Sequence, residues 1–184
     1  MQDILLFENL IEKKVIDSFR EFMISQAPWT RGGNSGFNNE NGMYHWACPF
    51  ENMEESDLYY TAIDMFDLLI QRIEQNSDLK FNPDKVQQIV LNCYEYGNYS
   101  GPHKDNLDDE NAISMILYLN TDWKPEWGGN TEFYDEAMQR VTSAVSPIGG
   151  DVVVFPGNLW HRGGDVSRIC TKAKYSITYQ GFLL

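Results

Sequence analysis

The sequence predicts a mainly β protein of the α+β class, a jelly roll with N-terminal helices packed on one sheet. Apolar residues recur at helical spacing only within the first 85 residues, and from Val86 onward they form the short alternating runs typical of strands. No internal repeat or long linker interrupts the 184 residues. We therefore expect one domain over 1–184, with helical support over about 1–85 and a jelly-roll core over about 86–184.

Composition narrows the class of protein. Hydrophobic residues make up 42% of the chain and aromatic residues 14%, which is enough apolar surface for a folded core. The net charge of −13 disfavours nucleic acid as a partner, because phosphate binding relies on basic surface. The apolar run Ile4–Phe7 is too short for a signal peptide or a membrane span, so we expect a cytoplasmic, soluble protein with no membrane partner. The sequence gives no indication of oligomeric state.

Three cysteines are far apart and in no zinc-finger spacing: Cys48, Cys93 and Cys170. An odd number in this arrangement argues against a disulfide framework. We expect reduced and mostly buried thiols.

Two segments have the spacing of amphipathic helices. Residues 8–25 and 57–76 each carry apolar residues three and four positions apart, and Ser56 or Asp57 is expected to cap the second helix. The expected inward-facing residues are Leu10, Ile11, Val15, Phe19, Phe22 and Met23 in the first helix, and Leu58, Ala62, Met65, Leu69, Ile70 and Ile73 in the second.

Between the helices, residues 31–46 combine glycine and asparagine with Phe37, Tyr44 and Trp46, an unusual composition for a connector. This segment is a candidate lid. His45 lies within it and is expected to be an exposed loop residue outside any ligand set.

The remaining chain contains six clear strand patterns separated by turn residues. They cover residues 86–96, 112–120, 130–135, 141–147, 151–156 and 174–182. Further short strands are expected near Met43 and around His161. About eight strands suit a double-sheet jelly roll, which hides its edges better than an open sheet does.

The stretch GPHKDN, residues 101–106, contains one of only three histidines. In an extended segment His103 and Asp105 project to the same side. His161 follows a buried strand and a Pro-Gly turn, which places it at a sheet rim as a candidate third ligand. Two imidazoles and a carboxylate on one face leave positions open, as non-haem Fe(II) needs for a chelating cosubstrate and dioxygen. The alternative is a loop histidine beside an aspartate. Pro102 favours the metal site, because it fixes φ of the turn and restricts Gly101, which makes the approach of the pair more rigid than a generic loop would.

The stretch KYSITYQ presents one polar face, made by alternate residues beginning at Lys174. A solvent-facing edge strand is one explanation. The charge distribution favours another, because four basic residues fall within 13 positions that hold a single acid, Asp165. Such a local reversal of charge suits an anionic ligand. The basic residues are Arg162, Arg168, Lys172 and Lys174.

Five motifs occur in a recognisable order between Ile89 and Phe182: CYEYGNYSGPHKDN, SMILYLNTDW, WGGNTEFYD, GGDVVVFPGNLWHRG and KYSITYQGF. Over this half of the chain the sequence resembles the prolyl 4-hydroxylase-like branch of the Fe(II)/2-oxoglutarate-dependent oxygenases. The resemblance implies a double-stranded β-helix, which agrees with the strand count.

The resemblance also implies site residues. His103, Asp105 and His161 match the iron ligands, and Lys174 matches the basic residue that binds the far carboxylate of 2-oxoglutarate, with Lys172 as the competing assignment. Tyr118 matches a tyrosine that assists the same carboxylate. Thr178 and Tyr94 are expected beside it, and for the aromatic residues core packing is the alternative explanation.

The implied cofactors and cosubstrates are Fe(II), 2-oxoglutarate and O2, with ascorbate as a candidate reductant. The implied reaction converts 2-oxoglutarate and O2 to succinate and CO2 while a substrate C–H bond is hydroxylated. The branch suggests a prolyl residue in a peptide or protein. Hydroxylation of a free amino acid or small metabolite is the alternative, and a non-catalytic jelly-roll binding module is the alternative from a different class.

Overall fold

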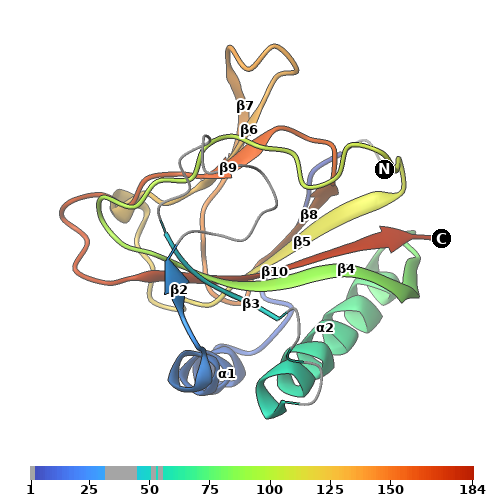
Figure 1. The fold of residues 1–184 in the computed structure, drawn as a ribbon, viewed down its shortest axis with the longest axis horizontal. Helices are drawn as coiled ribbons and strands as arrows, with labels where there is room; N and C mark the ends of the chain where they lie inside the picture. The colour runs from blue at the N-terminus through green and yellow to red at the C-terminus, as the bar shows by residue number, and fades with distance from the viewer. Residues whose placement is uncertain (1–2, 32–44, 51–52, 54–55) are drawn as a thin grey trace.

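The structure, a computed structural model, describes residues 3–31, 45–50, 53 and 56–184 (Figure 1). It contains helices α1 (Lys13–Gln26) and α2 (Asp57–Asn76) and a short 3-10 helix, η2 (Pro125–Trp127). The strands are β1 (Leu5–Phe7), β2 (Thr30–Arg31), β3 (Trp46–Pro49), β4 (Phe81–Tyr94), β5 (Ala112–Tyr118), β6 (Thr131–Tyr134), β7 (Val141–Val145), β8 (Val152–Pro156), β9 (His161–Gly163) and β10 (Lys174–Leu183).

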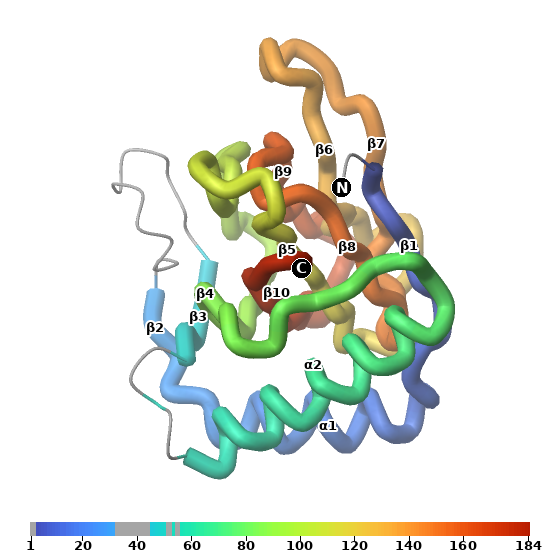
Figure 2. The backbone as a smooth tube through the Cα atoms, turned by 90° about the vertical axis from the view of Figure 1, so that its right-hand side faces the viewer, coloured from blue at the N-terminus to red at the C-terminus, as the bar shows by residue number. Residues whose placement is uncertain are grey.

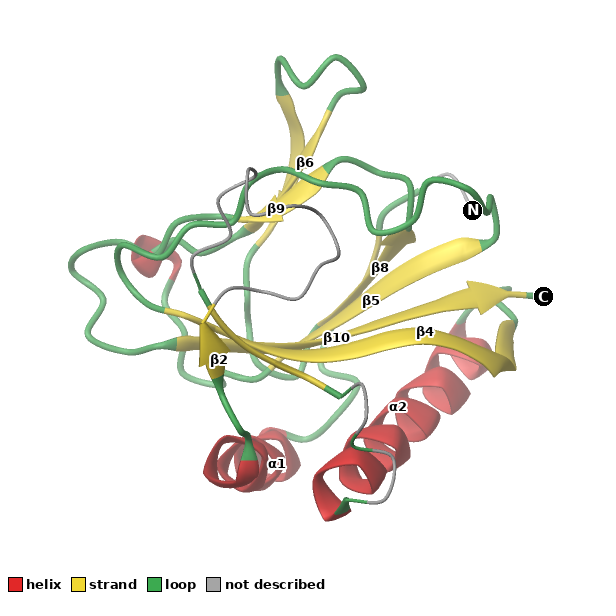
Figure 3. Cartoon of the chain, in the orientation of Figure 1, coloured by secondary structure: helices red, strands yellow, loops and turns green. Residues whose placement is uncertain are grey.

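The strands form two sheets, and every pairing between named strands is antiparallel. The larger sheet has the order β1-β8-β5-β10-β4-β3-β2, and the smaller has the order β7-β6-β9. Figure 3 shows the smaller sheet above the larger one, with both helices below. A buried cluster from β5 and β8 packs against Phe133 of β6 and Val145 of β7, which closes the space between the sheets. The predicted jelly roll with helices on one sheet is confirmed.

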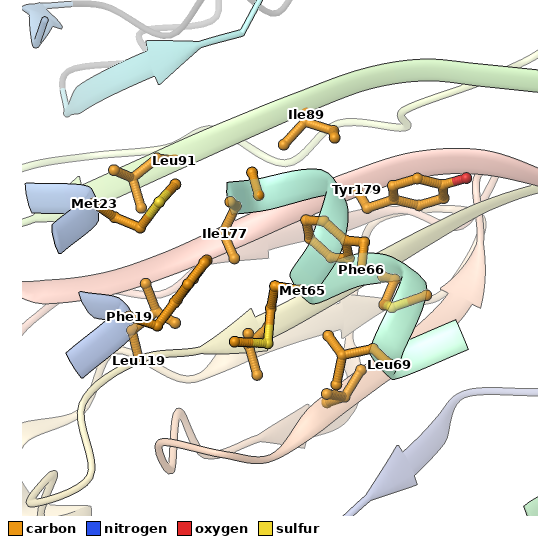
Figure 4. Close-up of a cluster of buried hydrophobic side chains, with 14 of the residues drawn as sticks. Phe19, Met23, Met65, Phe66, Leu69, Ile89, Leu91, Leu119, Ile177 and Tyr179 are labelled. Atoms are coloured by element: carbon orange, nitrogen blue, oxygen red, sulfur yellow. The ribbon is translucent and has the colours of Figure 1, made fainter. Parts of the chain in front are cut away.

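The main hydrophobic core lies between the larger sheet and the helices. Figure 2 shows α1 and α2 running along the same side of that sheet. The strand β5 is buried at all seven positions because it is covered on both faces. In Figure 4, Phe66 and Met65 of α2 lie over Ile177 and Tyr179 of β10. The other face of β10 therefore carries Lys174, Ser176, Thr178 and Gln180, as the alternation predicts.

The helix α2 has the predicted limits. Ser56 caps its N-terminus by accepting a hydrogen bond from the Tyr59 backbone N–H at 3.1 Å. The predicted inward-facing residues are buried except Ile70, which is partly buried, and Phe66 joins them.

The first helix begins later than predicted. Residues 5–7 pair with β8 as an edge strand, so the chain turns before α1 starts at Lys13. Val15 was expected in the core but is 45% exposed, while Ile16 is fully buried. Phe19 and Met23 are buried as expected, so the buried face of α1 runs through Ile16, Phe19 and Met23, and Val15 lies outside it.

All three cysteines are free and buried, as expected. None of the helices among the described residues is long and apolar enough to cross a membrane. The strand predicted near Met43 and most of the candidate lid, including Phe37 and Tyr44, lie outside the described residues.

Candidate active site

The backbone of His103 pairs directly with that of His161. Each residue donates its N–H to the carbonyl oxygen of the other, and both hydrogen bonds measure 2.9 Å. The N–H groups of Asp105 and Asn106 both donate to the carbonyl of Gly157, at 2.8 and 2.9 Å. Segment 103–106 is thereby fixed against the end of β8 and the start of β9, which brings the two distant motifs together.

Three side chains converge at this junction. The Nε2 atoms of His103 and His161 each lie 3.4 Å from a different oxygen of Asp105. One ligand atom from each residue falls within 4.8 Å of the other two. The Nδ1 of His103 lies 3.0 Å from the Gly101 carbonyl, and that of His161 lies 2.9 Å from the Leu159 carbonyl. Since a carbonyl only accepts, Nδ1 carries the proton on each ring and Nε2 is left facing the centre.

The protonation states follow from burial and mutual charge. Burial lowers the pKa of His161 to about 4, so its imidazole is neutral near pH 7. Burial alone would raise the pKa of Asp105, but the two histidines and Ser114 hold it well below its usual range. Burial also opposes the charged form of His103, yet its hydrogen bond to Asp105 raises its pKa. A metal binds neutral imidazole and ionised carboxylate, so metal binding at His103 would displace the proton that its hydrogen bond to Asp105 favours.

This donor set fits Fe(II). Two imidazole nitrogens and one carboxylate oxygen on one side of an ion form the facial arrangement of non-haem Fe(II) oxygenases, with the remaining positions open. The carbonyl partners of both Nδ1 atoms supply the outer interactions that orient ligating histidines.

Ser114 is a site residue that the sequence reasoning missed. Its hydroxyl donates a hydrogen bond to Oδ2 of Asp105 from the buried strand β5. The sequence signal for this residue was a serine within the otherwise apolar strand AISMILY, because a buried hydroxyl needs a hydrogen-bond partner.

Lys174 is buried beside the same cavity, with 2% of its surface exposed. Its Nζ donates to the Gly129 carbonyl at 2.8 Å and lies 4.4 Å from the centre of the Tyr94 ring. Burial lowers its pKa to about 8, which still leaves it mostly charged at pH 7. No ion pair among the described residues includes Lys174. The cavity therefore contains a buried cation that lacks a described carboxylate partner.

The competing residue, Lys172, lies elsewhere. It precedes β10, is exposed, and pairs with Asp122. Lys172 does not share a strand face with Lys174, because β10 begins only at Lys174. Among the other basic residues, Arg162 pairs with Glu132 at 2.9 Å, and neither Arg162 nor Arg168 borders the cavity.

The WGGN turn shapes the Lys174 site. Gly128 and Gly129 have φ angles of +66° and +74°, a region that favours glycine. A Cβ atom at position 129 would lie 3.1 Å from Cδ of Lys174. The absence of a side chain lets the backbone approach the lysine and present its carbonyl to the ammonium group.

The cavity opens to solvent, and its empty volume including the mouth is about 690 Å³. Its floor is a ladder of paired residues on β4 and β10, from Tyr94 opposite Lys174 to Gln88 opposite Gln180. The lining residues are His45, Gln88, Val90, Asn92, Tyr94, Ser100, His103, Asp105, Ile116, Thr131, His161, Gly163, Lys174, Ser176, Thr178 and Gln180.

Tyr118 and His45 lie near the cavity in different ways. Tyr118 does not border the cavity, although its hydroxyl donates at 2.7 Å to Thr131, which does. His45 was expected in an exposed loop but is 5% exposed and lines the cavity. Its ring stacks on Tyr94 with centres 4.3 Å apart, and its Nε2 lies 3.1 Å from Oδ1 of Asn92. Burial lowers the pKa of His45 to about 4.

Comparison with protein families agrees with this geometry. A family model described as the 2OG-Fe(II) oxygenase superfamily matches residues 89–179, a range that includes His103, Asp105, His161 and Lys174. No curated protein sequence matches the chain significantly.

Several solved structures share the fold at low sequence identity. A prolyl-4-hydroxylase from Pseudomonas putida is 16% identical, with a TM-score of 0.72 over 99% of this chain and 94% of that one. A prolyl hydroxylase from Trichoplax adhaerens, in complex with a hypoxia inducible factor peptide fragment, is 17% identical, with a TM-score of 0.66 over 97% and 83% of the chains. The non-heme alpha ketoglutarate dependent epimerase SnoN from nogalamycin biosynthesis is 13% identical, with a TM-score of 0.70 over 98% and 78%.

The jelly roll, the family match and the triad together define a 2-oxoglutarate-dependent dioxygenase. Residues 89–179 of the chain match the 2OG-Fe(II) oxygenase superfamily, which implies Fe(II), 2-oxoglutarate and O2. The resemblance inferred from the five motifs is confirmed. Ascorbate as a reductant stays a prediction.

Proposed function

We propose that this protein hydroxylates a C–H bond of a prolyl residue in a peptide or protein. The observation that carries the proposal is the placement of Lys174 in the same cavity as the triad, buried and without a carboxylate partner in the part of the chain that the structure describes. A cation in that position suits a dianionic cosubstrate that must reach a metal at its other end.

In this proposal His103, Asp105 and His161 hold Fe(II), and Lys174 pairs with the distal carboxylate of 2-oxoglutarate. Thr178 shares the strand face with Lys174 and offers a hydroxyl to the same ligand. Tyr94 packs against the lysine. Tyr118 acts indirectly, by orienting the Thr131 hydroxyl. Lysine gives a point charge where arginine would give a bidentate fork, so the surrounding hydroxyls must supply orientation.

When bound, the iron couples oxidative decarboxylation of 2-oxoglutarate, which yields succinate and CO2, to hydroxylation of the substrate. The protein contributes position and exclusion of water. The fixed Nδ1 contacts keep both imidazoles facing the centre, and Ser114 restrains the Asp105 carboxylate. The buried surroundings strengthen the charge interactions of Asp105 and Lys174.

A peptide substrate is supported by the fold shared with prolyl hydroxylases, one of which is bound to a peptide fragment. The second candidate is the same chemistry on a free amino acid or small metabolite. The fold similarity to SnoN, an epimerase from nogalamycin biosynthesis, supports this second candidate.

The deciding experiment incubates the protein with Fe(II), 2-oxoglutarate and a panel of proline-containing peptides, in parallel with free amino acids. Mass spectrometry then detects the gain of one oxygen atom, and succinate is measured in the same samples. Hydroxylation of a peptide at proline, absent in His103→Ala, supports the proposal. Oxygen gain only among the small molecules replaces it with the second candidate.

A further inference from the structure

Three amide side chains form a hydrogen-bonded row where the cavity floor meets the triad. Nδ2 of Asn106 donates to Oε1 of Gln87 at 2.8 Å. Nε2 of Gln87 then donates to Oε1 of Gln180 at 3.3 Å and to the backbone carbonyl of Asp105 at 3.4 Å. The roles proposed above for the triad and Lys174 leave this row unused.

A β-bulge brings Gln87 into the row. Gln180 pairs with Gln88, but the next residue, Gly181, pairs with Val86, so Gln87 has no partner in the ladder. Bulges of this kind redirect a side chain that regular alternation would place on the opposite face. Gln87 consequently lies beside Gln180 and reaches the segment that carries Asp105.

The direction of every hydrogen bond in the row is set by backbone groups. Oδ1 of Asn106 accepts from the N–H groups of Asp108 and Asp109, both at 3.0 Å, so its NH2 group must face Gln87. The Asp105 carbonyl can only accept, so Gln87 must turn its NH2 group toward it. Oε1 of Gln180 is therefore the acceptor at the end of the row.

Because Oε1 of Gln180 accepts from Gln87, the NH2 group of Gln180 is the part of its side chain that the row does not use. Gln180 lines the cavity, and its Nε2 makes no hydrogen bond among the described residues. We propose that Gln180 is a specificity-determining residue that donates an amide N–H to a carbonyl oxygen of the substrate, held in this orientation by Gln87 and Asn106. The inference rests on the proposed function and extends it to the group that the enzyme recognises.

The position of Gln180 assigns the contact to the substrate. Six residues of β10, or about 20 Å, separate Gln180 from Lys174. A five-carbon diacid held at Lys174 does not span that length. The side-chain amide of Gln180 carries no charge, so it suits a neutral amide carbonyl better than a carboxylate, which a cation such as Lys174 binds more strongly. A prolyl residue has no N–H, so its own and the preceding carbonyl are the groups that a donor recognises.

The first test compares Gln180→Met, which keeps side-chain length but removes the donor, with wild type on a hydroxylated prolyl peptide. We expect KM for the peptide to rise about 2- to 10-fold, as for loss of one neutral hydrogen bond. KM for 2-oxoglutarate is measured in the same variant, and the rise in KM for the peptide should exceed any rise in KM for 2-oxoglutarate. Gln87→Glu still accepts from Asn106 but cannot donate to Gln180, and should raise KM in the same direction. Gln71→Met, on the exposed side of α2, is the matched control.

The second test changes the substrate. The peptide is compared with analogues in which the carbonyl before or within the target prolyl residue is reduced to methylene. For one analogue, KM of the wild type should rise by the same factor by which KM of Gln180→Met rises with the parent peptide. Combining the variant with that analogue should then raise KM no further. If Gln180→Met raises KM for both analogues by the same factor as for the parent peptide, the inference is overturned.

The outcomes separate this inference from the proposed function. If wild type hydroxylates the peptide and Gln180→Met leaves KM within 2-fold, the inference fails while the function stands. If wild type oxidises only a small carbonyl compound, the peptide function fails, and a raised KM for that compound in Gln180→Met upholds the inference. Activity confined to compounds without a carbonyl overturns both.

Discussion

His103 and His161 are joined by two reciprocal backbone hydrogen bonds of 2.9 Å, although a long stretch of sequence separates them. The pairing fixes the separation of their Cα atoms before any metal binds. The side chains then need only the Nδ1 contacts to present both Nε2 atoms to Asp105. The candidate metal centre is therefore a property of the fold, which makes its residues open to direct tests.

Removal of a triad side chain should abolish tight Fe(II) binding. We expect Asp105→Ala to weaken Fe(II) affinity by more than about 100-fold, and Ser114→Ala by about 10-fold, because loss of an outer partner costs less than loss of a ligand. Calorimetric Fe(II) titration under anaerobic conditions measures both. Asp108→Ala, on the exposed part of the same loop, serves as control. Wild-type affinity in Asp105→Ala would remove this residue from the centre.

The two candidate lysines should differ in their effect on the cosubstrate. Lys174→Met should raise KM for 2-oxoglutarate at least about 10-fold, the range for loss of a hydrogen bond to a charged group. Lys172→Met, which breaks only an exposed pair with Asp122, should change KM less than 2-fold. Succinate formation at varied 2-oxoglutarate measures both. The reverse order of effects would assign the role to Lys172.

The pKa of Lys174, lowered by burial to about 8, predicts a pH dependence. The ammonium group loses its proton as pH rises through about 8, so kcat/KM for 2-oxoglutarate should fall above that pH in the free enzyme. Between about 8 and the ordinary value of 10.5 the unfolded chain binds more protons at this residue, so its contribution to the free energy of unfolding increases with pH. Lys174→Met should lack both trends, and an equal decline in that variant would point to another group.

A side chain at Gly129 should affect the cosubstrate, whereas one at Gly97 should not. Both glycines have positive φ, +74° and +84°, so alanine costs about 1–2 kcal/mol of stability at either position. Only Gly129→Ala places a Cβ close to Lys174, because a Cβ added at Gly97 would meet no described atom within 4 Å. KM for 2-oxoglutarate should rise in Gly129→Ala alone. Equal KM values in the two variants would show that the WGGN turn does not position Lys174.

The capping hydroxyl of Ser56 predicts a stability effect without a catalytic one. Ser56→Ala should lower the free energy of unfolding by about 0.5–2 kcal/mol, because the Tyr59 N–H loses its acceptor. Ser25→Ala, where the exposed hydroxyl donates to the Phe22 carbonyl and accepts from Nε2 of Gln26 on the surface, should stay within about 0.5 kcal/mol of wild type. Urea unfolding followed by circular dichroism compares them, and identical midpoints would refute the cap.

The sequence by itself determined the features that depend on local periodicity. Alternation predicted the strands of the core and the polar face that carries Lys174, Ser176, Thr178 and Gln180, and helical spacing predicted the limits of α2. The pattern of GPHKDN placed His103 and Asp105 on one side, because residues two apart in an extended chain share a face.

Tertiary structure alone decided what depends on pairing between distant strands. It moved Val15 out of the core, turned His45 inward against Tyr94, placed Tyr118 behind Thr131, and used a bulge to bring Gln87 beside Gln180. Register and bulges are set by contacts across the sheet, and the residues on one strand do not specify which partner lies opposite each of them.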